Sequence, residues 1–381
     1  MRTIFHLDLD AFFVSVERVL DPSLNGKSVI VGADPQYGRG VVAACSYEAR
    51  AYGLHSAMPI KQAYRLCPNG IYLHGHFAEY VRFSKAVKSI LTKYVPLIEQ
   101  ASIDEFYLDL TGCEKIYGSL FMFASKLQKE IMQNLSLPCS IGIAGNKTLA
   151  KIASDFNKPL GITYVLHGME KEFLSRMPVS AMPGIGRETT KSLLAKGFRT
   201  LGDIADSSED YFNLAFGKYG SDMWNKANGR GREFLSKPAE RKSIAHEKTF
   251  AADEIDKNKI ESVLFRLSGK VCQALRNYNW QSATVSVKLR YSDFITLTRA
   301  KTIEPTDDDK IVFETALELF RKAFTRRVAI RLIGIHLANF SEYNEQEKLF
   351  TDKDFMRDKM LHVVSKIRDK YGYESIRVGM Y

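Results

Sequence analysis

Apolar residues in the first 165 positions switch repeatedly between the alternating spacing of strands and the three- and four-residue spacing of helices. Strand-like runs lie at residues 3–9, 28–31, 41–44, 98–110 and 139–143. The run 98–110 fits two strands joined by a tight turn at residues 102–105. Helical spacing lies at residues 12–19, 80–94, 120–135 and 147–156. This order, close to βαββαβ, predicts an α+β unit with helices on one face of a sheet.

The rest of the chain differs from the first 165 residues in its predicted secondary structure. Residues from about 166 are helical and rich in loops, and the polar segment SKPAERKS at 236–243 is typical of a linker. Beyond it, further helices and strands predict a second, smaller α+β unit; the helices lie at 257–278 and 313–324, the strands at 284–291, 294–301 and 328–337. The last stretch, 342–381, is polar and contains one amphipathic helix. We therefore expect an α+β protein of several domains.

Length and charge limit the class of protein. A chain of 381 residues is too long for one compact core and predicts two to four packed units. The 54 Lys and Arg against 44 Asp and Glu give a net charge of +10, which favours a polyanionic partner. A generally basic, soluble surface is an equally good explanation of the charge alone.

Cysteine usage and hydropathy indicate an intracellular protein. The five cysteines are scattered and have no zinc-ligand spacing, so neither a disulfide framework nor a structural metal site is favoured. The N-terminus reaches Asp8 before an apolar signal segment could form, and no apolar run approaches the ~20 residues of a membrane helix. We expect a cytoplasmic protein that is not bound to a membrane.

Acidic residues gather at two places about a hundred residues apart. Asp8 and Asp10 end the first predicted strand and share its face, and Asp104 and Glu105 lie at the predicted tight turn. If the two places abut in one sheet, the converging carboxylates need a cation, and hard oxygen ligands without His or Cys suit Mg²⁺. The alternative is that these are ordinary exposed acids at strand ends.

Five segments in this order resemble the Y family of translesion DNA polymerases, and most of all its bacterial DinB type. They are DLDAFFVSVE (8–17), SYEARAYGLHSAMP (46–59), ASIDEFYLDLTG (101–112), CSIGIAGNKTLAKIASDFNKPLG (139–161) and MPGIGRETT (182–190). The resemblance runs from residue 2 to about residue 340. It implies a right-hand fold with palm, fingers, thumb and a little-finger α+β domain. The implied bounds are palm 1–10 and 74–165, fingers 11–73, thumb 166–235, linker 236–243, little finger 244–341 and tail 342–381.

The resemblance also implies an active site that holds two Mg²⁺ ions. The matching ligands are Asp8, Asp104 and Glu105, with the Leu9 carbonyl as a backbone ligand. The physical need is that of two-metal phosphoryl transfer, in which charge on the triphosphate must be neutralised. Asp10 falls outside the family's ligand set, so we interpret it as a supporting or structural residue.

The matching nucleotide contacts follow from the same resemblance. Phe13 matches the steric gate that excludes a ribose 2′-hydroxyl, and Phe12 lies against the sugar; the alternative is a pair of core aromatics. Tyr47, Arg50 and Lys158 match residues that contact the triphosphate. Ala44 departs from the family, whose members often have a hydroxyl residue at this position, and one triphosphate hydrogen bond is therefore in doubt.

Two regions match DNA contacts. MPGIGRETT resembles a helix-hairpin-helix element in which Gly184 and Gly186 let backbone amides approach a phosphate. Residues 241–341 contain 18 Lys and Arg against 12 Asp and Glu, and Lys288 and Arg290 share one strand face. Arg327 and Arg331 share a parity on a later strand. A basic sheet face suits contact with phosphates, although each residue alone could be an ordinary solvated charge.

The segment QEKLF resembles a sliding-clamp-binding peptide through Gln346, Leu349 and Phe350. The overall prediction is a monomeric, low-fidelity DNA polymerase without proofreading, which binds primer-template DNA, dNTPs and a clamp. The alternative from another class is a catalytically silent DNA- and clamp-binding protein on the same scaffold. A palm-fold nucleotide cyclase is disfavoured by the predicted thumb and little finger.

Overall fold

The computed structural model describes residues 2–37, 39–236, 240–343 and 353–376. The chain divides into two compact units, Met1–Pro238 and Ala239–Tyr381. The division falls within the polar segment 236–243 that the sequence predicts as a linker. Each unit has a hydrophobic core of its own.

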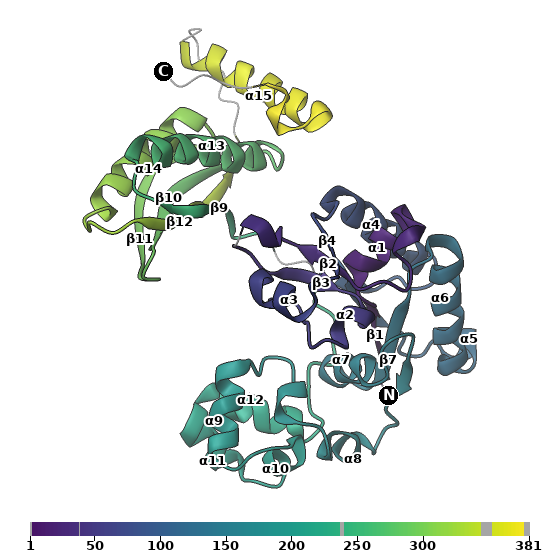
Figure 1. Cartoon of the computed structure of the whole chain (residues 1–381). Helices are drawn as coiled ribbons and strands as arrows, with labels where there is room; N and C mark the ends of the chain where they lie inside the picture. Colours follow the sequence, from purple (N-terminus) through teal and green to yellow (C-terminus); the bar gives the residue numbers. More distant parts are fainter. Residues whose placement is uncertain (1, 38, 237–239, 344–352, 377–381) are drawn as a thin grey trace. The chain divides into compact units, whose positions relative to one another are not determined.

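Five strands form the central sheet of the first unit (Figure 1). They are β1 (Ile4–Leu9), β5 (Ile98–Gln100), β6 (Glu105–Asp109), β7 (Cys139–Ala144) and β8 (Ile162–Tyr164), in the spatial order β5-β6-β1-β7-β8. β1 is antiparallel to both of its neighbours, and β7 is parallel to β8. The first strand of the chain is thus the middle strand of the sheet, and all six of its residues are buried.

Alternate residues of β1 enter two different cores, because successive side chains of a strand point to opposite faces. On one face, Phe5 and Leu7 pack with helices α4 (Phe77–Thr92) and α6 (Leu120–Leu135). On the other face, Ile4 packs with residues of α7 (Lys147–Phe156). Helices therefore cover both faces of the sheet, and the prediction of a single covered face is wrong.

Gly142 in β7 explains how α7 lies so close to the sheet. A Cβ atom at this position would lie 2.0 Å from the Ala150 carbonyl oxygen and 2.4 Å from the Ser154 amide nitrogen. On the neighbouring strand, His6 is fully buried, and its Nδ1 lies 2.7 Å from Ser154 Oγ. The packing of backbone against backbone thus fixes α7 over β1 and β7.

A three-stranded sheet occupies the segment between β1 and α4. Its strands are β2 (Val29–Gly32), β3 (Val42–Cys45) and β4 (Ile71–Leu73), in the order β3-β2-β4. The accompanying helices are α1 (Phe12–Leu20), α2 (Tyr47–Arg50) and α3 (Ile60–Leu66), with the short η1 (Pro22–Leu24) and η2 (Pro35–Tyr37). Ala11 joins β1 to α1 in the left-handed region, with φ 44°. The chain therefore turns sharply directly after Asp10.

The segment after β8 is helical, as the sequence predicts. It contains α8 (Glu170–Ser175), η3 (Val179–Ala181), α9 (Arg187–Ala195), α10 (Leu201–Ala205), α11 (Glu209–Phe216) and α12 (Lys218–Ala227). Its buried residues, among them Leu174, Leu193 and Phe212, belong to the core that also holds Leu149 and Ile152 of α7. The short α5 (Glu114–Tyr117) precedes α6.

The second unit is a four-stranded antiparallel sheet with helices. Its strands, in spatial order, are β11 (Thr296–Thr306), β10 (Trp280–Tyr291), β12 (Ile330–Glu342) and β9 (Ser243–Glu254). Helices α13 (Lys257–Arg276) and α14 (Asp309–Ala323) share a core with Val285, Val287 and Leu289 of β10. The sequence does not predict β9, and the first residue of this strand lies in the predicted linker.

The C-terminal helix α15 (Lys353–Tyr371) is followed by η4 (Tyr373–Ser375). Arg276 of α13 is buried and donates from Nε to Ser365 Oγ of α15 at 2.7 Å, which ties the helix to the second unit. None of the helices within the described ranges combines the length and the apolar character needed to span a membrane.

Candidate active site

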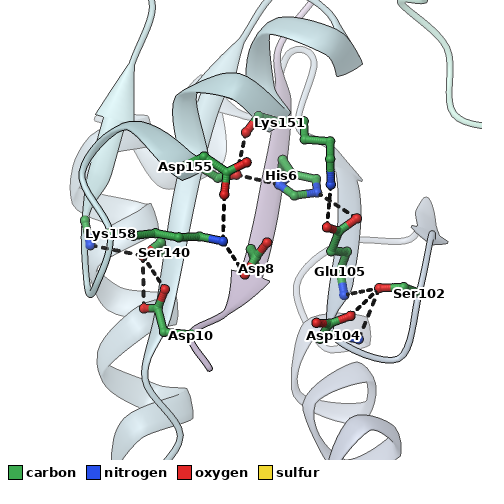
Figure 2. Close-up of polar contacts among 12 residues, drawn as sticks. His6, Asp8, Asp10, Ser102, Asp104, Glu105, Ser140, Lys151, Asp155 and Lys158 are labelled. Carbon is green, nitrogen blue, oxygen red and sulfur yellow. Dashed lines mark hydrogen bonds and ion pairs between the residues drawn. The ribbon is translucent and has the colours of Figure 1, made fainter. Parts of the chain in front are cut away.

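Asp8 and Glu105 lie directly opposite each other in the central sheet. They are paired residues of β1 and β6, and the backbone amide of the next residue, Leu9, donates to the Asp104 carbonyl oxygen at 3.0 Å. Both carboxylates point to the face covered by α7 (Figure 2). The two acidic segments that the sequence separates by about a hundred residues therefore meet at one end of the sheet, which is the condition on which the predicted cation site depends.

Asp104 is held by the turn that precedes β6. Ser102 Oγ lies 2.5 Å from Asp104 Oδ1 and accepts from the backbone amides of Asp104 and Glu105 at 3.3 and 3.0 Å. Among the residues that the structure describes, no three His, Cys, Asp or Glu side chains are gathered closely enough to hold one ion. The fold brings Asp8, Asp104 and Glu105 to the same end of the sheet, but the Asp104 carboxylate faces Ser102.

Two lysines neutralise the opposed carboxylates. Lys158 Nζ lies 2.7 Å from Asp8 Oδ1 and 2.7 Å from Asp155 Oδ1, and Lys151 forms an ion pair with Glu105. Figure 2 shows both lysines reaching the acids from the side of α7. The cations come from the segment that Gly142 allows to pack on the sheet, so the electrostatics of the site depend on that packing.

The pKa values of the two opposed carboxyl groups, Asp8 and Glu105, shift in opposite directions. Burial raises the pKa of Asp8 to about 7, although Lys158 acts in the other direction. The pKa of Glu105 falls to about 2, owing first to His6, whose Nε2 lies 3.7 Å from Glu105 Oε2, and then to Lys151. Burial lowers the pKa of His6 and favours its neutral form. Of these two carboxyl groups, Asp8 is the one whose ionised form a nearby cation would favour more.

Asp10 does not join the other acids. Its carboxylate accepts from Ser140 Oγ at 2.9 and 3.0 Å, and from the Leu160 amide at 2.9 Å. The strand ends at Leu9, so the alternation of faces does not extend to Asp10. The expectation of a shared face with Asp8 is wrong, and Asp10 instead fixes the loop that follows Lys158.

Of the two aromatic residues that follow β1, Phe12 lies in the core and Phe13 lies at the edge of the core. Phe12 is buried, whereas Phe13 is half-buried and stacks on Tyr80, with ring centroids 4.3 Å apart and planes at 10°. The left-handed Ala11 places both rings at the start of α1, directly beyond the end of β1. Phe12 is therefore a core aromatic residue, and its predicted contact with the sugar stays a prediction.

Tyr47 and Arg50 lie on α2 and are connected to the acidic end of β1. The Tyr47 hydroxyl donates to Asp10 Oδ1 at 3.4 Å, and the Arg50 guanidinium lies 4.6 Å from the centre of the Tyr47 ring. Burial, followed by the charge of Asp10, raises the pKa of Tyr47 to about 12. The structure thus brings the predicted residues of α2 to the same end of the sheet as Asp8 and Lys158.

Comparison with known proteins matches this arrangement to one family. The impB/mucB/samB family matches residues 7–155, and the C-terminal domain of that family matches residues 241–349. A DNA polymerase IV of Dehalococcoides mccartyi is 38% identical over 381 residues, which cover 100% of this chain and 97% of the relative. A DNA polymerase IV of Listeria monocytogenes is 41% identical over 339 residues, which cover 89% of this chain and 95% of the relative.

A solved structure agrees with the sequence matches. A Y-family DNA polymerase chimera has a TM-score of 0.78 and 28% identity, and the match covers 89% of this chain and 99% of the chimera. The chain belongs to the Y family of DNA polymerases. Its fold is therefore the right-hand α+β fold with palm, fingers, thumb and little finger, which confirms the predicted fold class.

The hairpin predicted to bind a phosphate in this Y-family chain lies before α9. Gly184 has φ 99°, in the region that favours glycine, and Gly186 is the N-cap residue of α9 with no side-chain cap. A Cβ at either position would have no atom within 4 Å. Both glycines are exposed, so this helix start has space for an approaching phosphate.

The four basic residues of the Y-family little finger lie in different surroundings. Lys288 forms an ion pair with Glu247 of β9 at 2.8 Å, and Arg290 Nε donates to Thr296 Oγ1 at 2.9 Å. Arg331 is the extra residue of a bulge in β12, and its guanidinium lies 4.6 Å from the centre of the Phe294 ring. Arg327 is exposed in the loop before β12. Lys288 and Arg290 therefore lie on the same face of β10, as the alternation along a strand predicts. Arg327 and Arg331 do not share a strand face, because Arg327 precedes β12.

Three residues around the Y-family site have no role in the sequence-based prediction. Sequence reasoning assigned no role to His6, Lys151 or Asp155. A signal was present, because Lys151, Asp155 and Lys158 recur at spacings of four and three along a predicted helix and its end. The peptide with Gln346, Leu349 and Phe350 lies outside the described residues.

Proposed function

We propose that this protein is a template-directed DNA polymerase of low fidelity that performs translesion synthesis. It adds nucleotides from dNTPs to a primer 3′-hydroxyl and has no proofreading activity. The observation that carries the proposal is the pairing of Asp8 with Glu105 across β1 and β6 in a Y-family chain, with Phe13 at the start of the next helix. The alternative of a silent DNA- and clamp-binding protein is not favoured, because these residues are intact.

We propose the domain bounds that the sequence predicts, and the positions of the elements support them. The proposed palm, 1–10 and 74–165, contains the five-stranded sheet, and the proposed fingers, 11–73, contain the whole three-stranded sheet. The proposed thumb, 166–235, contains α8 to α12. The proposed little finger, 244–341, contains the second sheet except for the first residue of β9 and the last residue of β12. The linker 236–243 includes the division between the two compact units.

The donor set at the end of β1 suits a hard divalent cation. Y-family polymerases are metal-dependent nucleotidyltransferases, and we propose that this chain uses two Mg²⁺ ions. The residues that would hold them are Asp8, Asp104 and Glu105, with the Leu9 carbonyl, all of which are oxygen donors. When bound, the ions supply activation of the primer hydroxyl and neutralisation of the triphosphate charge.

The neighbouring side chains bind and orient the nucleotide. Lys158, now shared between Asp8 and Asp155, is placed to exchange a carboxylate partner for a phosphate oxygen. Arg50 and Tyr47 on α2 supply a second cation and a hydroxyl for the triphosphate. Phe13 excludes ribose, and Phe12 lies against the sugar. His6 and then Lys151 lower the pKa of Glu105 and keep its carboxylate ionised, and the ion pair with Lys151 orients it.

The proposed macromolecular partners are primer-template DNA and a sliding clamp. The open helix start at Gly184 and Gly186, with Lys288, Arg290, Arg327 and Arg331, supports contact with DNA phosphates. The clamp contact is proposed for Gln346, Leu349 and Phe350 from sequence alone. We further propose that the protein acts as a monomer in the cytoplasm.

Primer extension tests the proposed function. The purified full-length chain is mixed with a labelled primer-template, dNTPs and Mg²⁺, on an undamaged template and on one with a single lesion. Template-directed extension past the lesion, with loss of extension when a chelator is added, is the expected result. Binding of the primer-template without extension under any divalent metal would favour the silent alternative.

A further inference from the structure

Tyr80 lies directly beneath the side chain proposed as the steric gate. Its ring stacks on Phe13 with centroids 4.3 Å apart, and Phe12 and Phe77 lie on either side with centroids 6.3 Å away. Tyr80 is 2% exposed, so it is part of the core, whereas Phe13 is half-buried. The position that Phe13 can hold therefore depends on whether the Tyr80 ring can move.

A buried carboxylate fixes the other end of Tyr80. The Tyr80 hydroxyl donates to Glu17 Oε1, and Glu17 is only 3% exposed. The same oxygen accepts from the His76 backbone amide at 3.1 Å, and His76 Nδ1 lies 3.0 Å from Glu17 Oε2. A hydroxyl bonded to a buried carboxylate is among the stronger neutral-to-charged hydrogen bonds.

The two contacts of Tyr80 lie on one face of α1. Phe13 and Glu17 are separated by four residues, so they are neighbours on the helix surface. Tyr80 spans this turn, with its ring on Phe13 and its hydroxyl on Glu17. His76, which is the N-cap residue of α4, connects the start of that helix to the same carboxylate. The carboxylate thus fixes both the ring and the helix that carries it.

Gly75 shows how little free space surrounds the hydroxyl. A Cβ at this position would lie 2.2 Å from the Tyr80 hydroxyl oxygen and 2.7 Å from Val31 Cγ1. The φ of Gly75 is not in the left-handed region, so the glycine is needed for space and not for backbone conformation. The contact between Tyr80 and Glu17 is therefore closely confined from the side of β2.

We propose that Glu17 is a positioning residue for sugar discrimination, which acts by holding Tyr80 rigid behind Phe13. A gate excludes a 2′-hydroxyl only if the ring cannot retreat when it is pushed. Phe13 has no polar group to fix it, so its resistance comes from what packs behind it. This inference rests on the proposed polymerase function and adds a residue that touches neither nucleotide nor metal.

The test compares incorporation of dNTPs and rNTPs by full-length variants. Tyr80→Phe keeps the ring and removes the hydroxyl, and Glu17→Gln keeps the size and removes the charge. We expect the ratio of kcat/KM for dNTP over rNTP to fall by about three- to tenfold in each. The double variant should fall no further than the lower single variant, because both changes remove one interaction. Gly75→Ala, which displaces the hydroxyl, should lower the ratio in the same direction.

Tyr94→Phe is the matched control. Its hydroxyl donates to Glu130 Oε2 at 2.6 Å, so it is a second Tyr–Glu hydrogen bond in the first unit, with aromatic partners Tyr117 and Phe123. It should lower the melting temperature without altering the sugar ratio. An unchanged ratio in Tyr80→Phe and Glu17→Gln, with dNTP extension intact, would overturn the inference, and so would an equal fall in Tyr94→Phe. If the wild-type chain extends no primer with dNTPs, the proposed function itself fails.

Discussion

Asp8 on β1 lies directly opposite Glu105 on β6, and each carboxylate is paired with a different lysine from one segment. Lys151 lies on α7 and Lys158 lies just beyond its end. The sheet brings the acids together, and one helix supplies the charges that offset them. A change at either the sheet or the helix should therefore affect the same chemistry.

Removal of the Asp104 carboxylate should abolish nucleotide addition. Asp104→Ala should reduce the extension rate by at least about a hundredfold, because the proposed metal ligand and its negative charge are lost. Binding of primer-template should change little, since the proposed DNA contacts lie elsewhere. Single-turnover extension and fluorescence anisotropy measure the two effects. Asp109→Asn, at the last residue of β6 and paired with Arg2, is the control and should retain extension. Full activity of Asp104→Ala would refute the assignment.

A smaller side chain at Phe13 should admit ribonucleotides. Phe13→Val should lower the ratio of dNTP to rNTP incorporation by at least about tenfold, because bulk alone excludes the 2′-hydroxyl. The effect should exceed that of Tyr80→Phe, which leaves the Phe13 ring in place. Steady-state kinetics with one dNTP and its matching rNTP measure the ratio. If the ratio does not change, the gate is another residue.

Much of the fold could be predicted because its helices have a strong period. The bounds predicted for 120–135 and 147–156 are those of α6 and α7. The strand β9 could not be predicted because it lies at the edge of its sheet. Only two of its residues, Ile244 and Phe250, are buried, so it shows no alternation of apolar and polar residues. The packing of α7 on the second face of the sheet was missed as well, since Gly142 leaves no apolar signal on that face.

Only those parts of the site that depend on local residue spacing or on family motifs could be predicted from the sequence. The sequence leaves open whether the two acidic segments abut in one sheet, and the structure shows that they do, with Asp8 opposite Glu105. The misplacement of Asp10 has a local cause, since β1 ends one residue earlier and Ala11 turns the chain. The contacts of His6 and Lys151 with Glu105 join distant segments. No spacing rule in one sequence gives such contacts.

The proposed clamp peptide can be tested without reference to its structure. Replacement of Gln346, Leu349 and Phe350 by Ala should leave extension by the free enzyme unchanged and remove stimulation by the matching sliding clamp. The reason is that Leu and Phe in a polar segment suit a pocket on a partner. Extension on primed circular DNA with and without loaded clamp is the measurement. Undiminished stimulation, or a loss of stability of the free enzyme, would place the clamp contact elsewhere.

Neutralisation of Lys288 and Arg290 should weaken DNA binding on all sequences alike. Each lost phosphate contact should reduce the slope of log affinity against log salt by about 0.9. Lys301→Gln with Lys322→Gln removes the same charge from side chains that bind Glu318 of α14, and serves as the control. Anisotropy titrations between low and moderate salt measure both slopes. Equal slopes in the two double variants would show that only net charge matters.

The last prediction concerns the close packing of α7 on β7. Gly142→Ala should destabilise the first unit by about 3 kcal/mol, because the added methyl group meets backbone atoms that cannot move by side-chain rotation. Gly145→Ala is the matched control on the same segment, since its Cβ would come no closer than 3.9 Å to the Arg2 carbonyl oxygen. Thermal unfolding followed by circular dichroism should separate the two variants by several degrees. Any folded Gly142→Ala protein should also lose extension activity, because a displaced α7 moves Lys151 and Lys158 away from Glu105 and Asp8. Wild-type stability of Gly142→Ala would mean that the helix does not rest on the sheet in this way.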